Sequence, residues 1–210
     1  MSGIANALAD LNEEEVARLV RDQLDAGADA VSLLNECRQG MDIVGERYKT
    51  GDYFLSELIV SGEIFKDSMK VIEPHLQASA DIGERTKIVL GTVKGDIHNI
   101  GKDIVAVLLK GAGFEVYDLG IDVEPQAMVD KLIETRAPIL GMSGLLTPSF
   151  DSMKQTVEAV KAAGIRDKVK IVIGGGVVTQ LVQRHAGADA FTDDGLEGVD
   201  ICKRFAEEMK

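Results

Sequence analysis

The stretch KIVLGTVKGDIHNIG, residues 87–101, decides how this chain is expected to fold. Its first half, residues 87–93, is a short apolar run rich in β-branched side chains, which is typical of a buried strand. Its second half is a polar loop, and an amphipathic helical segment follows from residue 102. A strand, a loop and a helix in this order predict one β-α unit, with the loop at the C-terminal end of the strand.

The same alternation continues along the rest of the chain. Further strand-like runs lie at residues 114–119, 138–143, 168–174 and 188–192, and helical stretches lie at residues 102–111, 125–135, 149–163, 179–185 and 196–209. Five β-α units in strict alternation predict an α/β domain, a parallel sheet with helices on both faces. We expect the flavodoxin-like (Rossmann-like) strand order 2-1-3-4-5, in which the strand order reverses between strands 1 and 3.

The first 80 residues have a helical period throughout. Asn12 followed by Glu15 predicts a capping box at the start of a helix that runs to about residue 25. Two longer periodic segments follow, separated by Gly51, and a short helix is expected over residues 4–11. These patterns predict a four-helix bundle over residues 1–80, a linker at 77–85 and the α/β domain over residues 86–210.

Bulk properties narrow the classes of partner. The net charge of −12 argues against nucleic acid or an anionic membrane, because both select basic surfaces. No apolar run approaches the roughly 18–20 residues of a membrane span, and the N-terminal residues do not look like a signal peptide. Cys37 and Cys202 are far apart and outside any CxxC motif, which is typical of reduced thiols. We therefore expect a cytoplasmic protein.

The candidate site lies at the C-terminal edge of the predicted sheet. His98 follows Asp96 by two residues, and a carboxylate commonly orients a metal-ligating imidazole through its second nitrogen. Taken alone, a loop histidine is more often a hydrogen-bonded side chain with no metal. Three other informative loops are expected at the same edge, at residues 143–149, 174–178 and 191–195.

Other known loop motifs do not match these loops in spacing or in residue type. From Gly95 to Gly101 and Lys102 the chain imitates a phosphate-binding P-loop, but five residues separate the glycines and Asp103 replaces the required Ser or Thr. No GxGxxG dinucleotide motif follows a strand. A phospho-receiver domain would carry an aspartate after strand 3, where this chain has Ser143.

On these motifs the chain resembles the cobalamin-binding (corrinoid) proteins of the methyl-carrying type, and it is similar to the cobalamin-binding module of methionine synthase. That family's signature is D-x-H-x-x-G, then S-x-L, then a Gly-Gly pair. The chain matches it with Asp96, His98, Gly101, Ser143, Leu145, Gly174 and Gly175. The resemblance covers nearly the whole length.

The resemblance implies a role for each matching residue. His98 would bind cobalt from below in place of the cofactor's own base, Asp96 would orient it, and Ser149 would complete the hydrogen-bonded relay. Ser143 and Thr147 would bond the cofactor's nucleotide tail. The implied cofactor site comprises Gly95, Asp96, Ile97, His98, Asn99, Ile100, Gly101, Ser143, Leu145, Thr147, Gly174, Gly175, Phe191 and Thr192.

The helical bundle would then be a cap over the methyl-bearing upper face of the cofactor. Tyr48 and Leu55, on either side of Gly51, match the aromatic residue and the leucine of such caps. Tyr48 departs from the phenylalanine of the methionine synthase cap. Ordinary packing within the bundle is the alternative explanation for both residues.

The function implied is that of a carrier, which receives a methyl group on cobalt from a substrate-specific methyltransferase. An acceptor methyltransferase, acting on tetrahydrofolate or a thiol, would take the methyl group away, and a reductive activase is a further implied partner. Catalysis would be shared with these partner enzymes, and the partner would select the methyl donor. Two alternatives stay open: a cobalamin-dependent sensor, and a flavodoxin-like domain with no cobamide.

Overall fold

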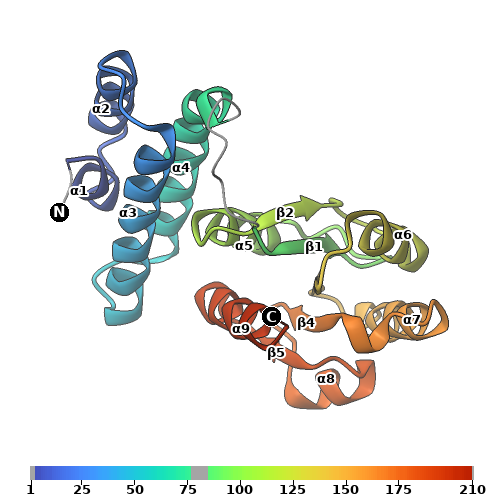
Figure 1. Ribbon diagram of the computed structural model, residues 1–210. Helices are drawn as coiled ribbons and strands as arrows, with labels where there is room; N and C mark the ends of the chain where they lie inside the picture. The colour runs from blue at the N-terminus through green and yellow to red at the C-terminus, as the bar shows by residue number, and fades with distance from the viewer. Residues whose placement is uncertain (1–2, 77–84, 210) are drawn as a thin grey trace. The chain divides into compact units, whose positions relative to one another are not determined.

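The computed structural model describes residues 3–76 and 85–209, so residues 77–84 of the expected linker lie outside the described residues. The chain divides into two compact units, Met1–Arg85 with Gly111–Gly113, and Thr86–Lys110 with Phe114–Lys210. The first unit is helical and the second contains a parallel sheet (Figure 1). The predicted fold class is confirmed.

The helical unit contains four helices among its described residues: α1 (Gly3–Ala9), α2 (Glu13–Asp25), α3 (Ala30–Thr50) and α4 (Leu55–Leu76). Asn12 starts α2 as predicted, because its side-chain oxygen accepts a hydrogen bond of 3.2 Å from the backbone N–H of Glu15. The other half of the predicted capping box does not form, because the Asn12 N–H donates to the carbonyl of Ala7 and the Glu15 carboxylate accepts from Arg18. Gly51 ends α3 in the left-handed region, with a φ of 83°. The first helix ends at Ala9, two residues earlier than predicted, and Leu11 in the following turn has a φ of 58°.

Contacts of α1 with α2 and α3, and of α4 with α2 and α3, enclose the core of this unit. Its largest fully buried side chains are Ile4, Leu8, Leu33, Phe65 and Ile72. Phe65 and Ile72 lie two turns apart on α4, as one buried helix face requires, whereas Leu55, Ile59 and Val60 of the same helix are exposed.

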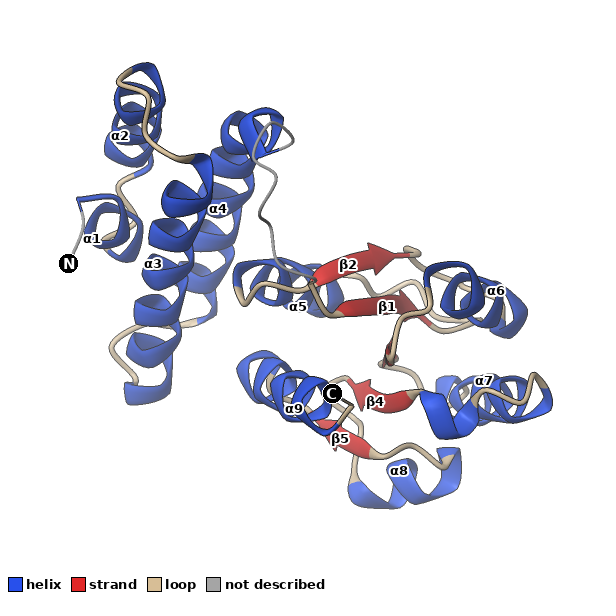
Figure 2. Ribbon diagram, viewed as in Figure 1, coloured by secondary structure: helices blue, strands red, loops and turns tan. Residues whose placement is uncertain are grey.

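The second unit alternates strands and helices to the end of the described chain (Figure 2). Its elements are β1 (Lys87–Thr92), α5 (Ile100–Gly111), β2 (Glu115–Asp118), α6 (Pro125–Thr135), β3 (Ile139–Ser143), α7 (Ser149–Ala162), the 3₁₀ turn η1 (Arg166–Lys168), β4 (Lys170–Gly174), α8 (Gln180–Ala186), β5 (Ala190–Thr192) and α9 (Gly195–Glu208). The strand order is β2-β1-β3-β4-β5 and every neighbouring pair is parallel, as predicted.

Several element ends differ from the prediction by one or two residues. The strand predicted from Lys168 begins at Lys170, because Arg166–Lys168 forms a 3₁₀ turn instead. Helix α5 begins at Ile100, so Ile100 and Gly101 belong to its first turn. Apolar periodicity identifies the middle of an element better than its ends, where turn geometry decides.

Helices cover both faces of the sheet, with α5 and α9 on one face and α6, α7 and α8 on the other (Figure 1). Side chains of β1, β3 and β4, among them Val89, Leu140 and Ile171, form a buried core with α6, α7 and α8. Among the described residues, no helix is long and apolar enough to cross a membrane.

Candidate cofactor site

Four neighbouring strands end at the same level of the sheet. Thr92 of β1 pairs with Ser143 of β3, Ser143 pairs with Gly174 of β4, and Gly174 pairs with Thr192 of β5. The loops after these strands therefore leave from one edge of the sheet. In open α/β sheets, ligands bind at this edge, where the strand order reverses.

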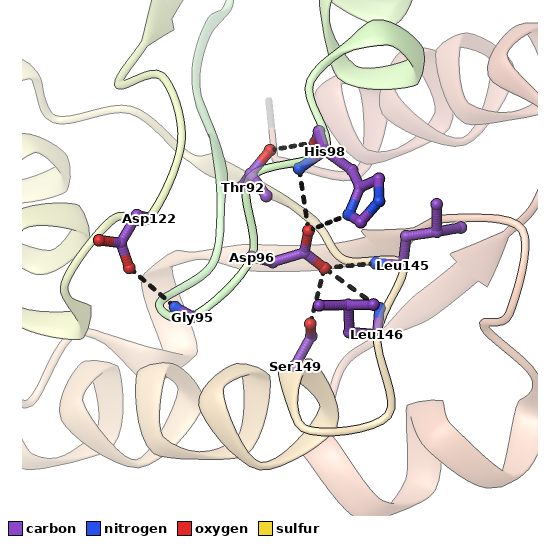
Figure 3. Close-up of polar contacts among 8 residues, drawn as sticks. All are labelled: Thr92, Gly95, Asp96, His98, Asp122, Leu145, Leu146 and Ser149. Atoms are coloured by element: carbon purple, nitrogen blue, oxygen red, sulfur yellow. Dashed lines mark hydrogen bonds and ion pairs between the residues drawn. The ribbon is translucent and has the colours of Figure 1, made fainter.

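Asp96, in the loop after β1, is the centre of the polar contacts drawn in Figure 3. Its carboxylate is fully buried. Oδ1 accepts hydrogen bonds from the backbone N–H of His98 at 3.0 Å and from Nδ1 of its ring at 2.7 Å. Oδ2 accepts from the backbone N–H groups of Leu145 at 2.6 Å and Leu146 at 3.2 Å, and from the Ser149 hydroxyl at 2.7 Å. Asp96 thus joins the β1 loop to the β3 loop.

This network keeps Asp96 ionised. Burial by itself raises the pKa of the carboxyl, but hydrogen bonds from the backbone of His98 and Leu145, from the Ser149 hydroxyl and from the His98 ring outweigh it and hold the pKa well below its ordinary value. An ionised carboxylate accepts hydrogen bonds and cannot donate them. The short contact to the His98 ring therefore has Nδ1–H as its donor.

His98 consequently presents a free lone pair. A neutral imidazole that carries its proton on Nδ1 is an acceptor at Nε2. Nε2 makes no hydrogen bond within residues 3–76 and 85–209, and the His98 side chain is 46% exposed. One imidazole is too few ligands to hold a metal ion by protein alone, but it suits a metal whose other positions a macrocycle fills.

Three hydrogen bonds that brace this loop were not predicted from the sequence. The hydroxyl of Thr92 donates to the carbonyl of His98 at 3.0 Å. Asp122, in the loop after β2, accepts from the backbone N–H of Gly95 at 2.8 Å (Figure 3). The N–H of Asp122 donates to the carbonyl of Asp96 at 3.0 Å. The positions of Thr92 at a strand end and Asp122 in a loop carried no motif that could have identified them.

Glycine is required for different reasons at the two positions that end and follow β4, Gly174 and Gly175. A Cβ on Gly175 would lie 2.1 Å from the carbonyl oxygen of Gly144, and the φ of Gly175 is 139°, so the protein's own packing excludes a side chain there. Among the described residues, a Cβ on Gly174 would meet only the carbonyl oxygen of Thr192, at an ordinary 3.6 Å. Gly144 also packs against Ser149, where a Cβ would approach to 2.8 Å, and the sequence motifs had not singled it out.

The other predicted residues occupy the same edge with different surroundings. Ser143 is half-buried and Thr147 is exposed, and neither hydroxyl bonds another of the described residues. Phe191 is half-buried, whereas Thr192 is buried and its hydroxyl contacts Glu197 and Asp194 at the start of α9. The Thr192 hydroxyl is therefore already used within the protein.

Exposed apolar side chains lie next to His98 in the sequence, and another lies in the β3 loop. Ile97 and Ile100 are each more than two-thirds exposed, and Leu145 of the β3 loop is 38% exposed. Gly95 forms a turn with a φ of 83°, Asn99 bonds the side chain of Asp103, and Gly101 lies in the first turn of α5, with no atom within 4 Å of a Cβ position. Apolar groups exposed beside a polar ligand are typical of a binding surface.

In the helical unit, Tyr48 is half-buried on α3 and Leu55 is exposed at the start of α4. Phe54, immediately before Leu55, is 69% exposed and is an aromatic residue that the sequence motifs did not single out. The adjacent Tyr53 fixes this turn, because its hydroxyl donates to the carbonyl of Ala9 at 2.7 Å and accepts from Arg47 at 2.8 Å.

Comparison with known proteins assigns the chain to a family. The B12 binding domain family matches residues 86–200, and a second B12 binding domain family matches residues 2–73. Trimethylamine corrinoid protein 1 of Methanosarcina acetivorans is 38% identical over 196 residues, which cover 92% of this chain and 91% of that protein.

Similar solved structures also include cobalamin-binding proteins. A cobalamin-binding protein from Desulfitobacterium hafniense is 43% identical, with a TM-score of 0.75 and coverage of 96% of both chains. A chain of the methanol:cobalamin methyltransferase complex from Methanosarcina barkeri has a TM-score of 0.84 over 97% of this chain and 78% of that chain; at 24% identity it shows the shared fold. With a B12 binding domain over more than half of its length and full-length corrinoid relatives, this chain belongs to the corrinoid protein family, and its cofactor is a cobalamin or a related corrinoid.

Proposed function

We propose that this chain carries a methyl group on cobalamin, with Nε2 of His98 as the lower ligand of the cobalt and the cofactor's own base displaced. The bound cofactor supplies a cobalt centre that accepts a methyl group from one substrate and gives it to another. The observation that carries the proposal is the His98 ring itself, whose Nδ1 is fixed by a buried carboxylate and whose Nε2 has no hydrogen-bond partner among the described residues.

We assign the cofactor's extended nucleotide tail to the loops after β3 and β4, which leave from the same edge of the sheet as the His98 loop. The hydroxyls of Ser143 and Thr147 are proposed to bond the tail. Gly174 supports this assignment, because the protein itself leaves room for a Cβ there and a passing ligand would supply the missing reason for glycine. Ser149 is proposed to act through Asp96, whose orientation its hydroxyl fixes.

We further propose that the helical unit covers the upper face of the cofactor with the exposed pair Phe54 and Leu55. Phe54 is a better candidate for the shielding aromatic than Tyr48, because it is exposed and Tyr48 is half-buried. Covered cobalt cannot react, so the cap must move aside for each transfer.

The partners that we propose are a substrate-specific methyltransferase, an acceptor methyltransferase that acts on tetrahydrofolate or a thiol, and a reductive activase. The likeness to a trimethylamine corrinoid protein supports a role in such a system. The net charge of −12 would favour partners with basic docking surfaces. Two free, buried cysteines, Cys37 and Cys202, suit the reducing cytoplasm, which we propose as the location.

A histidine-labelling experiment tests the ligand assignment. The chain is labelled with ¹⁵N-histidine, reconstituted with cobalamin and reduced to the cobalt(II) state, and the nitrogen hyperfine splitting is read by electron paramagnetic resonance. We expect the ¹⁵N pattern in the wild type and its loss in His98→Ala. The matched control is His185→Ala, because His185 also pairs with an aspartate, Asp151, at 2.9 Å and lies on α8. A pattern that persists in His98→Ala would refute the assignment.

Methyl transfer is tested separately. Reduced holoprotein is mixed with candidate methyltransferases and a panel of donors, including methylamines, methanol and betaines, and methylation of cobalt is followed by absorbance. Transfer from one donor class with its cognate enzyme is the expected result. Failure of every partner enzyme to methylate a holoprotein that binds cobalamin normally would point to the sensor alternative.

A further inference from the structure

Lys102 is a buried cation two residues into α5, and the proposed function does not use it. Its side chain is 2% exposed. The ammonium group contacts the carboxylate of Asp118, at the end of β2, and that of Asp103 at 2.6 Å. A buried ammonium group is costly unless it is paired, so the position of Lys102 is tied closely to that of Asp118.

A chain of hydrogen bonds joins this ion pair to the backbone of His98. The second oxygen of Asp118 accepts from the N–H of Gly120 at 2.9 Å. The carbonyl of Gly120 accepts from the N–H of Thr92 at 2.9 Å, and the Thr92 hydroxyl donates to the carbonyl of His98 at 3.0 Å. The end of β2 is thereby connected to the residue that carries the free imidazole.

The same ion pair also acts from the other side of His98. Lys102 lies four residues after His98, in the first turn of the helix that the histidine loop enters. In that turn, the N–H of Asp103 donates to the carbonyl of Asn99 at 2.8 Å, and the Asn99 side chain donates to the Asp103 carboxylate at 2.9 Å. A shift of Lys102 would move this turn, and with it the end of the loop.

We infer that the Lys102–Asp118 ion pair is a positioning device for His98, which sets the distance and direction from which its Nε2 meets the metal. The inference rests on the proposed function. Asp96 fixes the rotation of the ring, and the ion pair fixes the backbone from which the ring projects. Lys102 and Asp118 are therefore positioning residues with no contact to the cofactor in this assignment.

The competing explanation is that the ion pair only stabilises the fold. Both explanations predict a less stable protein when the pair is broken, so stability alone does not separate them. They differ in the bound state, because only a positioning role changes the share of cobalamin that carries a histidine nitrogen on its cobalt.

The test uses Lys102→Met, Asp118→Asn and the double variant in the full chain, labelled with ¹⁵N-histidine and loaded with cobalt(II) cobalamin. Asp118→Asn is nearly isosteric and keeps an acceptor for Gly120, so it removes the charge pairing while the neighbouring hydrogen bond can persist. The control is Lys161→Met, which removes a lysine of the same domain from an exposed pair with Glu158. The readouts are the fraction of cobalt with the ¹⁵N pattern and the urea unfolding of the chain without cofactor.

We expect each single variant to lower the histidine ligation equilibrium about tenfold, the lower end of effects for residues that orient metal ligands. The double variant should be no worse than either single variant within about twofold, because both remove one interaction. The control should match the wild type.

Two results would overturn the inference. One is a set of single variants that unfold more easily but keep the wild-type ¹⁵N pattern, and the other is a double variant whose loss is the product of the two single losses. If Lys102→Met does not fold, Asp118→Asn decides by the first criterion. A wild type without any ¹⁵N pattern would instead refute the proposed function, so the two failures are distinguishable.

Discussion

Replacing Asp96 by asparagine should change which nitrogen of His98 carries the proton. One carboxylate oxygen becomes an NH₂ group, and it must take the place of either Oδ1 or Oδ2. At Oδ2 it would face two backbone N–H groups, those of Leu145 and Leu146, which cannot become acceptors. At Oδ1 it would face one backbone N–H and the His98 ring. The ring can change tautomer, so the NH₂ group should settle there.

The consequence for His98 follows from the tautomer. A ring that accepts at Nδ1 carries its proton on Nε2, and Nε2 then has no lone pair for a metal. We therefore expect histidine ligation of cobalt in Asp96→Asn to fall about 10–100-fold, the range found when an orienting partner of a metal ligand is lost.

The same geometry sets the stability cost. Asp96→Asn leaves one part-buried donor, the N–H of His98, without its acceptor, at a cost of about 1–3 kcal/mol, and the bonds at the other oxygen lose their charged acceptor. We expect the free energy of unfolding of the cofactor-free chain to fall by about 3 kcal/mol. Urea unfolding measures this, and ¹⁵N-histidine paramagnetic resonance of the reconstituted variant measures the ligation.

Asp122→Asn is the matched control, because Asp122 is in the neighbouring loop and accepts one backbone hydrogen bond, from Gly95. Its ion pair with Lys94 is half exposed and screened by solvent, so its removal should change the free energy of unfolding far less than Asp96→Asn does. An Asp96→Asn variant that unfolds within 0.5 kcal/mol of the wild type, a margin of about the size of a surface substitution, and keeps its ¹⁵N pattern would refute the reasoning.

Three further predictions concern the same loops. The pKa of Asp96 is lowered in the folded state, so the ionised carboxylate stabilises the fold fully above the ordinary carboxyl pKa of about 3.9 and less as the pH falls below it. Urea titrations from pH 5 to pH 2 should therefore show a decline in the free energy of unfolding that is smaller in Asp96→Asn. Equal declines in the two proteins would contradict this. Gly175→Ala should destabilise the cofactor-free chain by about 3 kcal/mol in urea unfolding, because its Cβ would overlap the Gly144 carbonyl. Gly174→Ala should change the free energy of unfolding by less than about 1 kcal/mol, but it should weaken cobalamin binding in titrations. Ser149→Ala removes one hydrogen bond to Asp96 and should cost about 1–2 kcal/mol in urea unfolding while cobalamin still binds, so a variant as stable as the wild type would show that the bond contributes nothing.

Local signals in the sequence predicted most of the fold. The alternation of apolar runs and helical periods identified all five strands of the described sheet and their order. Asn12 and Gly51 act at helix ends through bonds to residues within four positions, so their roles could be read from neighbours alone. The start of β4 was placed too early because a 3₁₀ turn and a strand share the same residue types near Lys168.

In the candidate site, contacts between sequence neighbours were predicted and contacts between distant segments were not. His98 and Asp96 are two residues apart, and their ring-to-carboxylate bond is a local event that the motif itself predicted. Gly144 and Phe54 were not predicted, because a close approach to Gly175 and the exposure of one aromatic residue depend on how segments pack. The tie between Lys102 and Asp118 spans 16 residues and likewise had no local sign.

By itself, the sequence predicted the fold class and the strand order, because strict alternation of strand and helix patterns favours a doubly wound parallel sheet, while the resemblance to corrinoid proteins singled out His98 and its carboxylate partner Asp96. Only the tertiary structure decided the state of that carboxylate. Asp96 is buried and ionised because Leu145, Leu146 and Ser149, which follow it by 49 to 53 residues, donate to it once β1 and β3 pair. The direction of the His98 lone pair follows from those distant donors, since an ionised acceptor at Nδ1 is what leaves Nε2 free.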